Sequence, residues 1–590
     1  MLAIRSIRNV LSTRPFALSH LSPKSPPLVS TARTMATKTV AVLDESELKD
    51  GQMKEVAFEE GKVLLSRLGD KIHATSAFCT HYGAPLAKGV LTADGRVVCP
   101  WHGACFNVCT GDIEDAPAPT ALHSFQARVE NGKILITANP ADTEKKNLSR
   151  PPKLLASGYQ ASNKPGVVIV GGGSGAFHAI ESLREHGYNG TITVLSKENY
   201  APIDRTKLSK ALITDASKLE WRSQAELQAK YGVLLRTSTE VTAVDLENKV
   251  VVIGATNERV AYETLILASG ATPRQLPIEG KELGNVFTFR GVEDAKKVDA
   301  AVTEGKHLVV IGSSFISMEL VVAVQKRNLA SIDVIGMESF PFEAVLGKKV
   351  GAALKKFHES KGIKFHMESS VSKLLPSSTS PTSVGAVIVE SSSGHETTLE
   401  ADAVIMGVGV APATEYLKAS KGFEGVLDRS GGVAVDELLK VKGLEDVYAV
   451  GDIALYPQPG TGEQRRIEHW NVAGNQGRAV GKTIAEGKGQ PFVKIPVFWS
   501  AQGQQLRYCG VGAGFDDVII DGNLDELKFV AYYVKADKVI AVASMQRDPV
   551  VSKASELLRL GLMPSPSEVR NGKDLLSVDI QTVAAKPKVA

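Results

Sequence analysis

Two cysteines and two histidines in the N-terminal part of this 590-residue chain have the types and the spacing of metal ligands. Cys79 and His81 are separated by one residue, and Cys99 and His102, which follow 17 residues later (82–98 intervene), are separated by two. Thiolate sulfur and imidazole nitrogen are both good ligands for zinc and iron. The pattern therefore predicts a metal centre in which each half of the sequence supplies one sulfur and one nitrogen.

The order of these ligands favours an iron–sulfur cluster over a zinc ion. Zinc fingers usually place both cysteines in one half of the motif and both histidines in the other. A Rieske [2Fe–2S] centre instead holds one iron with two thiolates and the other iron with two imidazoles. Gly83 and Gly103 follow the two histidines, where tight loops must bring the backbone close to the cluster. A zinc site is the alternative.

The residues next to the ligands influence the reduction potential of such a cluster. The N-terminal part of the chain resembles Rieske ferredoxins, and this resemblance allows a comparison at the neighbouring positions. Respiratory Rieske proteins carry a disulfide-forming cysteine in each ligand loop, and the matching positions here are Ala84 and Trp101. They also carry a serine and a tyrosine that donate to the cluster sulfurs, and the matching positions here are Ala104 and Phe106. The resemblance therefore implies a potential toward the low end of the Rieske range, roughly −150 mV.

Further along the chain, the segment VVIVGGGSGA predicts a dinucleotide site. Gly171 and Gly173, followed by Ala176, come directly after an apolar strand-like run and before a helix-like run. The first glycine permits the turn, the second lets a pyrophosphate approach, and the small third residue lets the helix pack on the strand. Glu198, after the next predicted strand, is the acidic residue expected to bind the ribose. The alternative is a structural glycine turn that binds no ligand.

A second and more degenerate copy of this pattern lies about 140 residues later, in VVIGSSFISME. It carries Gly312 and two serines, Ser314 and Ser317, where glycine or alanine is usual. Glu338 follows the next predicted strand, and an acid there favours the free ribose 2′-hydroxyl of NADH over the phosphate of NADPH. The two motifs together predict one flavin and one nicotinamide site.

This two-site part of the chain resembles flavin-dependent pyridine-nucleotide oxidoreductases. The segments that carry the resemblance are APIDRTKLSK (201–210), ETLILASGATPR (263–274), ADAVIMGVGVAPAT (401–414) and DVYAVGDIALYP (446–457). The resemblance implies further FAD contacts at Arg205, Lys210, Asp452, Trp470 and Trp499. For NAD it implies contacts at Gly312, Ser314, Glu319, Glu338 and Gly409. A dithiol reductase is excluded, because no cysteine lies between Cys109 and Cys509.

The order of the parts narrows the resemblance to the Rieske-containing branch of the apoptosis-inducing factor family. Residues 467–481 and 514–553 are similar to segments of that branch. The resemblance implies three catalytic residues, with Phe315 covering the flavin and Glu319 paired with Lys210 near its reactive nitrogen. Ordinary structural roles are the alternatives, because a phenylalanine on a helix is usually in the core and a first-turn glutamate complements the helix dipole.

The patterns together predict a multidomain fold. It combines an all-β Rieske domain, two α/β Rossmann-like domains for FAD and NAD(P), and a C-terminal α+β reductase domain. The predicted boundaries are 1–36 for a transit peptide or disordered tail, 37–140 for the Rieske domain, 141–165 for a linker, 166–292 with 431–490 for the FAD domain, 293–430 for the NAD(P) domain and 491–590 for the C-terminal domain.

Composition excludes several classes of protein. The net charge is +3 with both signs interspersed, which argues against nucleic-acid binding, and no apolar run reaches the ~18 residues of a membrane span. The first 36 residues contain Arg5 and Arg8 and many serines, with no acid before Asp44. That composition predicts a mitochondrial transit peptide. A start at Met35 would give a cytoplasmic form instead.

The predicted activity is electron transfer from NAD(P)H, with NADH favoured, through FAD to the chain's own [2Fe–2S] cluster. From there electrons would pass to an external acceptor. The sequence does not identify this acceptor, and a protein is one of the candidates. Flavin is the required link, because a nicotinamide gives two electrons together and a Rieske cluster takes one at a time. The alternative is an NADH-responsive redox sensor in cell-death signalling with low turnover. The sequence does not determine the oligomeric state, and a homodimer is one of the candidates.

Overall fold

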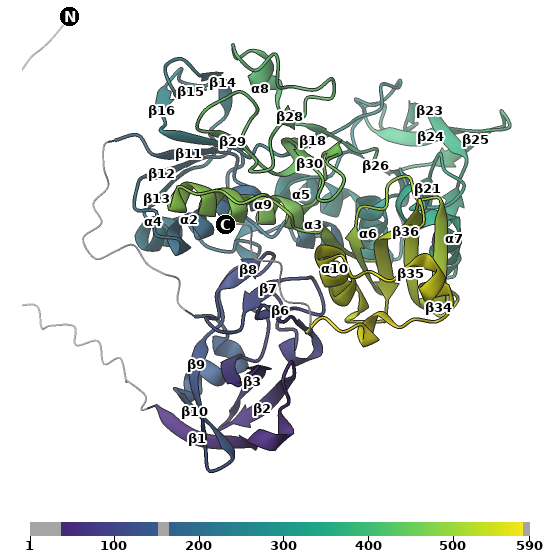
Figure 1. Ribbon diagram of the computed structural model, residues 1–590. Helices are drawn as coiled ribbons and strands as arrows, with labels where there is room; N and C mark the ends of the chain where they lie inside the picture. Colours follow the sequence, from purple (N-terminus) through teal and green to yellow (C-terminus); the bar gives the residue numbers. More distant parts are fainter. Residues whose placement is uncertain (1–36, 151–163, 582–590) are drawn as a thin grey trace, which may run out of the picture. The chain divides into compact units, whose positions relative to one another are not determined.

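The computed structural model describes residues 37–150 and 164–581 (Figure 1). The predicted transit peptide, the alternative start at Met35 and the central part of the predicted linker lie outside the described residues. Over the described ranges, no helix combines the length and the apolar composition that a membrane crossing needs.

The N-terminal domain consists of two antiparallel sheets. The larger one has the order β1-β10-β9-β4-β3-β2, and its strands are Lys38–Asp44, Lys133–Ala138, Ser124–Glu130, Lys71–Ser76, Gly61–Leu68 and Met53–Phe58. The smaller one has the order β5-β6-β7-β8, and its strands are Val90–Leu91, Arg96–Val98, Cys105–Asn107 and Ile113–Asp115. Alternate residues of β10 are buried, as expected for a strand with one face on the core. Short 3₁₀ turns, η1 (Glu45–Glu47) and η2 (Leu86–Lys88), join the strands.

The first part of the predicted linker belongs to this domain. Helix α1 (Pro140–Thr143) is capped by Asn139 and is followed by η3 (Lys145–Asn147). Arg150 then donates a hydrogen bond to the carbonyl oxygen of Thr110 at 2.9 Å. These contacts to the β-domain mean that the polar composition of residues 141–150 reflects a surface position and not a free connection.

The first α/β domain has a parallel sheet with the order β13-β12-β11-β17-β29. Its strands are Val233–Arg236, Ile192–Leu195, Val167–Val170, Thr264–Leu267 and Val447–Ala449. All four residues of β11, VVIV, are buried, as a central strand covered on both faces requires. The longer helices of this domain are α2 (Ser174–Glu185), α4 (Gln224–Tyr231) and α9 (Trp470–Glu486).

Helices α2 and α9 lie side by side in Figure 1, and glycines make this approach possible. Gly474, Gly477 and Gly481 form one face of α9, because they recur at intervals of three and four residues. A Cβ at Gly477 would lie 2.2 Å from the carbonyl oxygen of Gly175 in α2. The close packing therefore fixes α9, and with it Trp470, against the start of α2.

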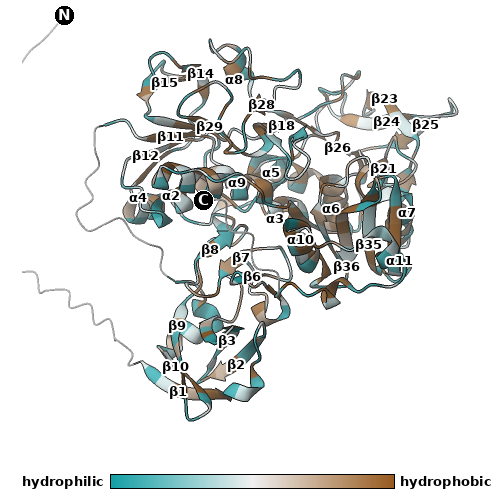
Figure 2. Cartoon of the chain, in the orientation of Figure 1, coloured by the Kyte–Doolittle hydropathy of each residue, from teal (hydrophilic) through white to brown (hydrophobic). Residues whose placement is uncertain are grey.

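The second α/β domain has a parallel sheet with the order β19-β26-β20-β21-β22. Its strands are Val286–Phe287, Ala403–Met406, His307–Ile311, Ser331–Ile335 and Lys364–His366. Its helices are α5 (Val292–Ala301), α6 (Phe315–Val324) and α7 (Glu343–Glu359). Helix α6, with the sequence FISMELVVAV, is apolar over most of its length and largely brown in Figure 2. Such a helix must be covered by other elements.

The C-terminal domain covers this region with an antiparallel sheet of order β32-β33-β36-β35-β34. Its strands are Val497–Ala501, Gln505–Gly510, Lys538–Met545, Lys528–Lys535 and Asp517–Asn523, and its helices are α10 (Val550–Leu560) and α11 (Pro566–Arg570). Buried residues of α6, such as Met318 and Leu320, share one apolar core with Phe529 and Tyr533 of β35.

Smaller elements complete the fold. Three-stranded sheets are β14-β15-β16 (Val241–Asp245, Val250–Ile253, Arg259–Ala261), β23-β24-β25 (Ser369–Pro376, Val384–Ser391, Glu396–Glu400) and β28-β30-β31 (Val433–Ala434, Ala454–Pro457, Gln464–Arg465), and β18 (Ala271–Pro273) pairs with β27 (Val410–Pro412). Other helical segments are α3 (Thr206–Ala211), α8 (Glu415–Lys418), η4 (Ala216–Lys218), η5 (Gly451–Ile453) and η6 (Leu575–Ser577). Leu417 of α8 and Phe423 lie in the core of the first α/β domain, so the chain returns to that domain before residue 431.

Candidate functional site

The four predicted metal ligands lie on two loops of matching construction. The N–H of Cys79 donates to the carbonyl oxygen of Ala84, and the N–H of Cys99 donates to that of Ala104, both at 2.8 Å. In each loop a glycine after the histidine has a positive φ, +73° in the first and +71° in the second. Glycine enters this left-handed region at little cost, which lets each loop fold tightly around its ligands.

The ligands converge as one sulfur pair and one nitrogen pair. The thiols of Cys79 and Cys99 are hydrogen-bonded to each other, and Nδ1 of His81 lies 3.1 Å from Nδ1 of His102. Nowhere among the described residues do three or more His, Cys, Asp or Glu side chains surround one point in a way that could hold a single ion. One sulfur pair and one nitrogen pair match the two irons of a [2Fe–2S] cluster, of which one is ligated by thiolates and the other by imidazoles.

The surroundings act differently on the histidine and the cysteine ligands. Burial lowers the pKa of His81 to about 4 and also holds the pKa of His102 well below its usual value. Both imidazoles are therefore neutral at pH 7, as a metal ligand must be. Backbone N–H groups of His81 and Tyr82 donate to the sulfur of Cys79, and those of Trp101 and His102 donate to Cys99. These donors favour negative charge on the two sulfurs, and the pKa of Cys99 is lowered, but burial still raises the pKa of the Cys79 thiol well above its usual value.

The other cysteines of this domain are not placed as ligands. Cys105 is fully buried, and burial raises the pKa of its thiol far above the usual value. Cys109 is exposed, and its sulfur lies 3.5 Å from Nε2 of His73. Strand β7 carries Cys105 into the core, and the turn after it carries Cys109 to the surface.

A low midpoint potential is expected for the cluster. Ala84, Ala104 and Phe106 are buried beside the ligand loops and offer neither a disulfide nor a hydroxyl donor. Hydroxyl donors to the sulfurs raise the potential of a cluster, because they favour its more negative, reduced state. A redox titration followed by the visible spectrum is expected to give a midpoint toward roughly −150 mV. A midpoint above about +100 mV, inside the same range, would contradict this expectation.

The first dinucleotide motif has the geometry of a phosphate-binding turn. Gly171, between β11 and α2, has a φ of +113°, and a Cβ there would lie 2.2 Å from the carbonyl oxygen of Ala268. A Cβ at Gly173 would meet nothing within 4 Å, and no side chain caps α2 at this residue. Open space in front of an uncapped helix N-terminus suits a pyrophosphate. Ala176 is fully buried where α2 begins.

Two ion pairs hold the acidic residues predicted for FAD. Both carboxylate oxygens of Glu198 accept hydrogen bonds from Arg205 at 2.7 Å, and Tyr200 donates to the same carboxylate at 2.8 Å. Burial would raise the pKa of Glu198, but the guanidinium of Arg205 lowers it below the usual value. Asp452 in η5 pairs with Arg290 at 2.6 Å. Arg290 belongs to none of the sequence motifs, so only the structure associates it with the site.

The second dinucleotide motif forms a similar turn. Gly312 has a φ of +102°, and a Cβ there would lie 2.3 Å from the carbonyl oxygen of Gly407. Ser314 is the N-cap residue of α6, and its side chain makes no capping hydrogen bond. A Cβ at Gly409 would meet nothing within 4 Å, and Glu338 is exposed after β21. The serine in place of glycine is therefore compatible with the turn.

Lys210 and Glu319 form a partly buried ion pair between α3 and α6, with their charged atoms 3.0 Å apart. Ser500 donates to the other oxygen of the Glu319 carboxylate at 2.6 Å, and Ser209 donates to the oxygen that Lys210 contacts. The carboxylate is only 4% exposed. Single serines carry no sequence signal, and the two were therefore not predicted as part of the site.

Phe315, at the start of α6, lies in an aromatic cluster. Its ring centroid is 5.1 Å from the ring of Phe342 and 5.1 Å from the ring of Phe498. The side chain is half-buried. The structure thus places it beside the C-terminal domain, and its predicted role over the flavin stays a prediction.

The histidine ligands contact aromatic residues of the reductase part directly. The ring of His102 lies 4.3 Å from the ring of Trp499 in β32, centroid to centroid. His81 lies 5.7 Å from Trp499 and 5.8 Å from Trp221. Trp221 is 6.2 Å from Trp470, whose buried indole nitrogen has no hydrogen-bond partner. The predicted cluster and the predicted flavin contacts therefore belong to one continuous site, which Trp221 joins without a sequence signal.

Hydrogen bonds fix the ligand-bearing domain to the reductase part at this site. They run from Ser552 Oγ to the carbonyl oxygen of Cys99, from the N–H of Ala116 to Oδ1 of Asn475, and from Arg478 to the carbonyl oxygen of Ile113, each at 2.8 Å. Two of the three use backbone carbonyls as acceptors, so the contact depends on the path of the loops and not only on their side chains.

A buried charge cluster lies in the same contact. The carboxylate of Asp115 forms ion pairs with Arg96 of β6 and, at 2.7 Å, with Lys494, which precedes β32. Burial would raise the pKa of Asp115, but the two cations hold it well below the usual value. All three side chains are no more than 12% exposed. The pairing of buried charges therefore contributes to holding the domains together.

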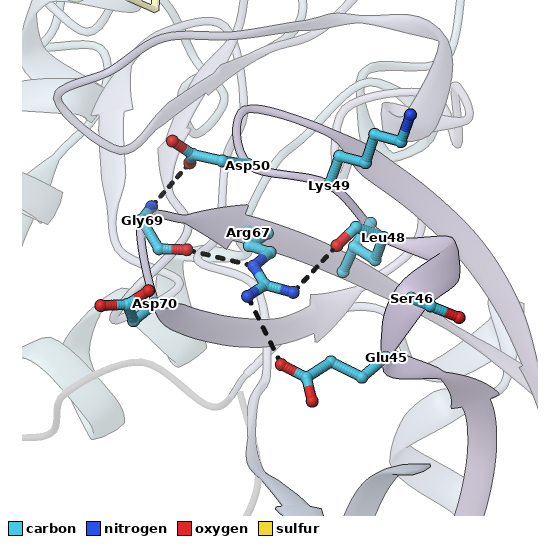
Figure 3. A pocket seen from close by; sticks show the side chains of 8 residues that line it. All are labelled: Glu45, Ser46, Leu48, Lys49, Asp50, Arg67, Gly69 and Asp70. Atoms are coloured by element: carbon cyan, nitrogen blue, oxygen red, sulfur yellow. Dashed lines mark hydrogen bonds and ion pairs between the residues drawn. The ribbon is translucent and has the colours of Figure 1, made fainter. Parts of the chain in front are cut away.

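A surface depression on the larger sheet of the Rieske domain is unrelated to these groups (Figure 3). Arg67 lies across it and donates to the carbonyl oxygens of Leu48 and Gly69 at 3.1 Å. Its guanidinium also lies 3.4 Å from Glu45. These contacts satisfy the arginine, and the depression holds none of the predicted ligands.

Three family models match the chain, and each covers one of the parts described above. The model "Rieske [2Fe-2S] domain" matches residues 38–126, "Pyridine nucleotide-disulphide oxidoreductase" matches 165–477, and "Reductase C-terminal" matches 497–577. The fold and the site thus define a flavin-dependent NAD(P)H oxidoreductase of the ferredoxin-reductase type that carries its own Rieske domain. Its cofactors are FAD, NAD(P)H and a [2Fe–2S] cluster.

Comparison with whole proteins assigns the chain to a family within this class of oxidoreductases. Human apoptosis-inducing factor 3 is 39% identical over 530 residues, which cover 88% of this chain and 84% of the relative. Rhodocoxin reductase of Rhodococcus erythropolis is 30% identical and matches 68% of this chain and 91% of its own length. The chain belongs to the Rieske-containing apoptosis-inducing factor 3 branch of the apoptosis-inducing factor family.

Solved structures agree with the reductase part of this assignment. The ferredoxin reductase for the CYP199A2 system of Rhodopseudomonas palustris has a TM-score of 0.63 and 28% identity, and it covers 72% of this chain and 100% of its own. The covalent putidaredoxin reductase–putidaredoxin complex also gives a TM-score of 0.63, with 26% identity over 69% of this chain and 96% of its own.

Proposed function

We propose that this protein takes electrons from NAD(P)H through FAD to its own Rieske cluster and releases them singly to an external acceptor. The observation that carries the proposal is the contact between His102, a cluster ligand, and Trp499 of the reductase part, at a centroid separation of 4.3 Å. Bound FAD supplies the exchange between paired and single electrons that such a route needs. The shared chain raises the effective concentration of the two partners above that of separate proteins.

The residues around this contact support a positioning role. Ser500 and Lys210 hold the Glu319 carboxylate in one orientation, and Ser500 directly follows Trp499 in β32. Burial lowers the pKa of His469 to about 3, so this histidine beside Trp499 is neutral at pH 7. Glu338, exposed beyond β21, supports a preference for NADH, because a carboxylate repels the 2′-phosphate of NADPH.

Single-turnover stopped flow with NADH and no added acceptor tests the proposal. The flavin absorbance and the cluster absorbance are both expected to fall, the second after the first. A flavin that is reduced while the cluster stays oxidised would overturn the proposal. The alternative, an NADH-responsive sensor of low turnover, is tested by light scattering with and without NADH, where a change of mass would favour it.

The contact with Trp499 makes a specific prediction for the variant Trp499→Leu. Leucine keeps an apolar side chain in β32 but removes the ring that touches His102. Reduction of the cluster by NADH is expected to slow, because the ring in contact with the ligand His102 is lost. Flavin reduction in the same trace serves as the internal control. Equal slowing of both signals would assign Trp499 to flavin binding alone.

We also propose, from the sequence alone, that residues 1–36 direct the chain to mitochondria. The four arginines of this segment and the lack of acids before Asp44 support the proposal. Import into isolated mitochondria tests it, with Arg5→Glu and Arg8→Glu together as the variant expected to abolish import. Normal import of that variant would count against the proposal.

A further inference from the structure

One of the two histidine ligands is stacked on an exposed tyrosine. Both ligand rings lie near Trp499, His102 at 4.3 Å and His81 at 5.7 Å between centroids. Tyr82 is stacked face to face on His81, at 3.7 Å between centroids and 18° between planes, whereas it meets the ring of His102 edge-on at 5.5 Å. Tyr82 is 37% exposed, and it is one of the few large apolar side chains on the described surface. An exposed ring stacked on a buried metal ligand is a short path between the cluster and solvent.

Tyr82 is held in this position from the reductase side. Its hydroxyl donates to the carboxylate of Asp204, which is fully buried and also accepts hydrogen bonds from Thr206. Lys207, at the start of α3, places its ammonium 4.9 Å from the centroid of the Tyr82 ring and 5.7 Å from that of Trp221. The tyrosine is therefore a fixed contact surface and not a mobile side chain.

The rim of this surface is basic. Lys207 is 35% exposed, and Asp204, 3.6 Å away, offsets its charge from inside the protein. The exposed Lys145 lies over Gly83, since a Cβ there would be 3.1 Å from its Cε, and its ammonium is 5.0 Å from the centroid of Phe78. Lysines on both sides of an exposed aromatic ring favour a partner that is negatively charged.

We propose that the face formed by Tyr82, Lys145 and Lys207 is the docking site of the external acceptor and that this acceptor is an acidic electron-carrier protein. The proposal rests on the proposed function. Electrons would enter on the side of Trp499 and leave on the side of Tyr82. In each transfer the protein is oxidised by one electron and the acceptor is reduced by one, with no bond made and no proton moved.

Native cytochrome c and its fully succinylated form test the proposal as probes. Both contain the same haem, but the first is basic and the second is acidic. Binding is measured first, without NADH and at low ionic strength, by biolayer interferometry. Reduction of each probe is then followed at the haem band after one equivalent of NADH. The acidic form is expected to bind more tightly and to be reduced about tenfold faster, an advantage that added salt removes.

The double variant Lys145→Glu with Lys207→Gln is expected to abolish this preference in both measurements. The matched control is Lys373→Glu in β23 with Lys488→Gln after α9, which makes the same change of net charge at other exposed positions. A preference for the basic probe, or equal losses in the variant and the control, would overturn the proposal. Reduction of the cluster by NADH without a probe is measured in the single variant Lys145→Glu, where it stays unchanged, so failure here is distinguishable from failure of the proposed function.

Discussion

The variant Cys99→Ala is expected to lose the iron–sulfur cluster completely, together with its visible absorption and its iron. Cys99 is fully buried, and its sulfur accepts backbone hydrogen bonds from Trp101 and His102. Alanine has no donor atom, and the one remaining thiol, Cys79, cannot hold the sulfur-ligated iron alone. Iron analysis and the visible spectrum of the purified protein measure the effect.

The matched control for this variant is Cys105→Ala. It removes an equally buried thiol six residues away, which lies on strand β7 outside the two ligand loops. The control is expected to keep its iron and its FAD. Retention of iron by Cys99→Ala, or its loss from Cys105→Ala, would contradict the assignment of ligands.

The variant Asp115→Asn is expected to lower stability by about 3 kcal/mol, because it leaves the buried cations Arg96 and Lys494 without their shared carboxylate. The value is at the lower end of the 3–5 kcal/mol typical of a broken buried pair, because Glu114 stays 3.9 Å from Arg96. The unfolding transition in which the contact between the domains is lost is expected to move to a lower urea concentration. Tryptophan fluorescence during urea unfolding measures it.

The effect of Asp115 depends on pH in a defined direction. The pKa of this carboxyl is lower in the folded state than the ~3.9 of an unfolded aspartate. Its contribution to stability is therefore complete above about pH 4 and is lost as the pH falls through the folded pKa. The difference between wild type and variant is expected to stay constant from about pH 5 to pH 8 and to shrink only below about pH 4.

An exposed pair serves as the control for Asp115. Asp44 and Lys133 lie 2.6 Å apart at the edge of the larger sheet, with side chains 49% and 54% exposed. Because solvent screens such a pair, Asp44→Asn is expected to change stability by less than about 1 kcal/mol. An equally small effect of Asp115→Asn would show that the buried cluster does not hold the domains together.

The sequence predicts the ligand and phosphate motifs because each is a local pattern. The two Cys/His pairs are close along the chain, and Gly171 and Gly312 each stand between a strand and a helix. A glycine that must adopt a positive φ is visible in the sequence, because few other residues tolerate that conformation. The same holds for the apolar runs that form the two parallel sheets.

Domain boundaries and side-chain contacts that depend on residues far apart in the chain were harder to predict from the sequence. Residues 141–150 read as a linker, yet Arg150 and α1 pack on the Rieske domain. Arg290 and Ser500 belong to no motif, and each enters the site only because the fold brings it to Asp452 or Glu319. Ser209 lies within the segment 201–210, but only the structure shows that it donates to Glu319. A single polar residue has no periodicity or spacing from which such a contact could be inferred.

The sequence by itself determined the chemistry: the type of cluster, the two dinucleotide sites and the order of the domains, because these follow from residue types at short spacing. Only the tertiary structure decided how the domains meet. It brought His102 to Trp499, separated by almost 400 positions in the chain, and it turned Tyr82 outward on the other ligand. Such contacts arise from the packing of loops, helices and buried charges, which no local pattern encodes.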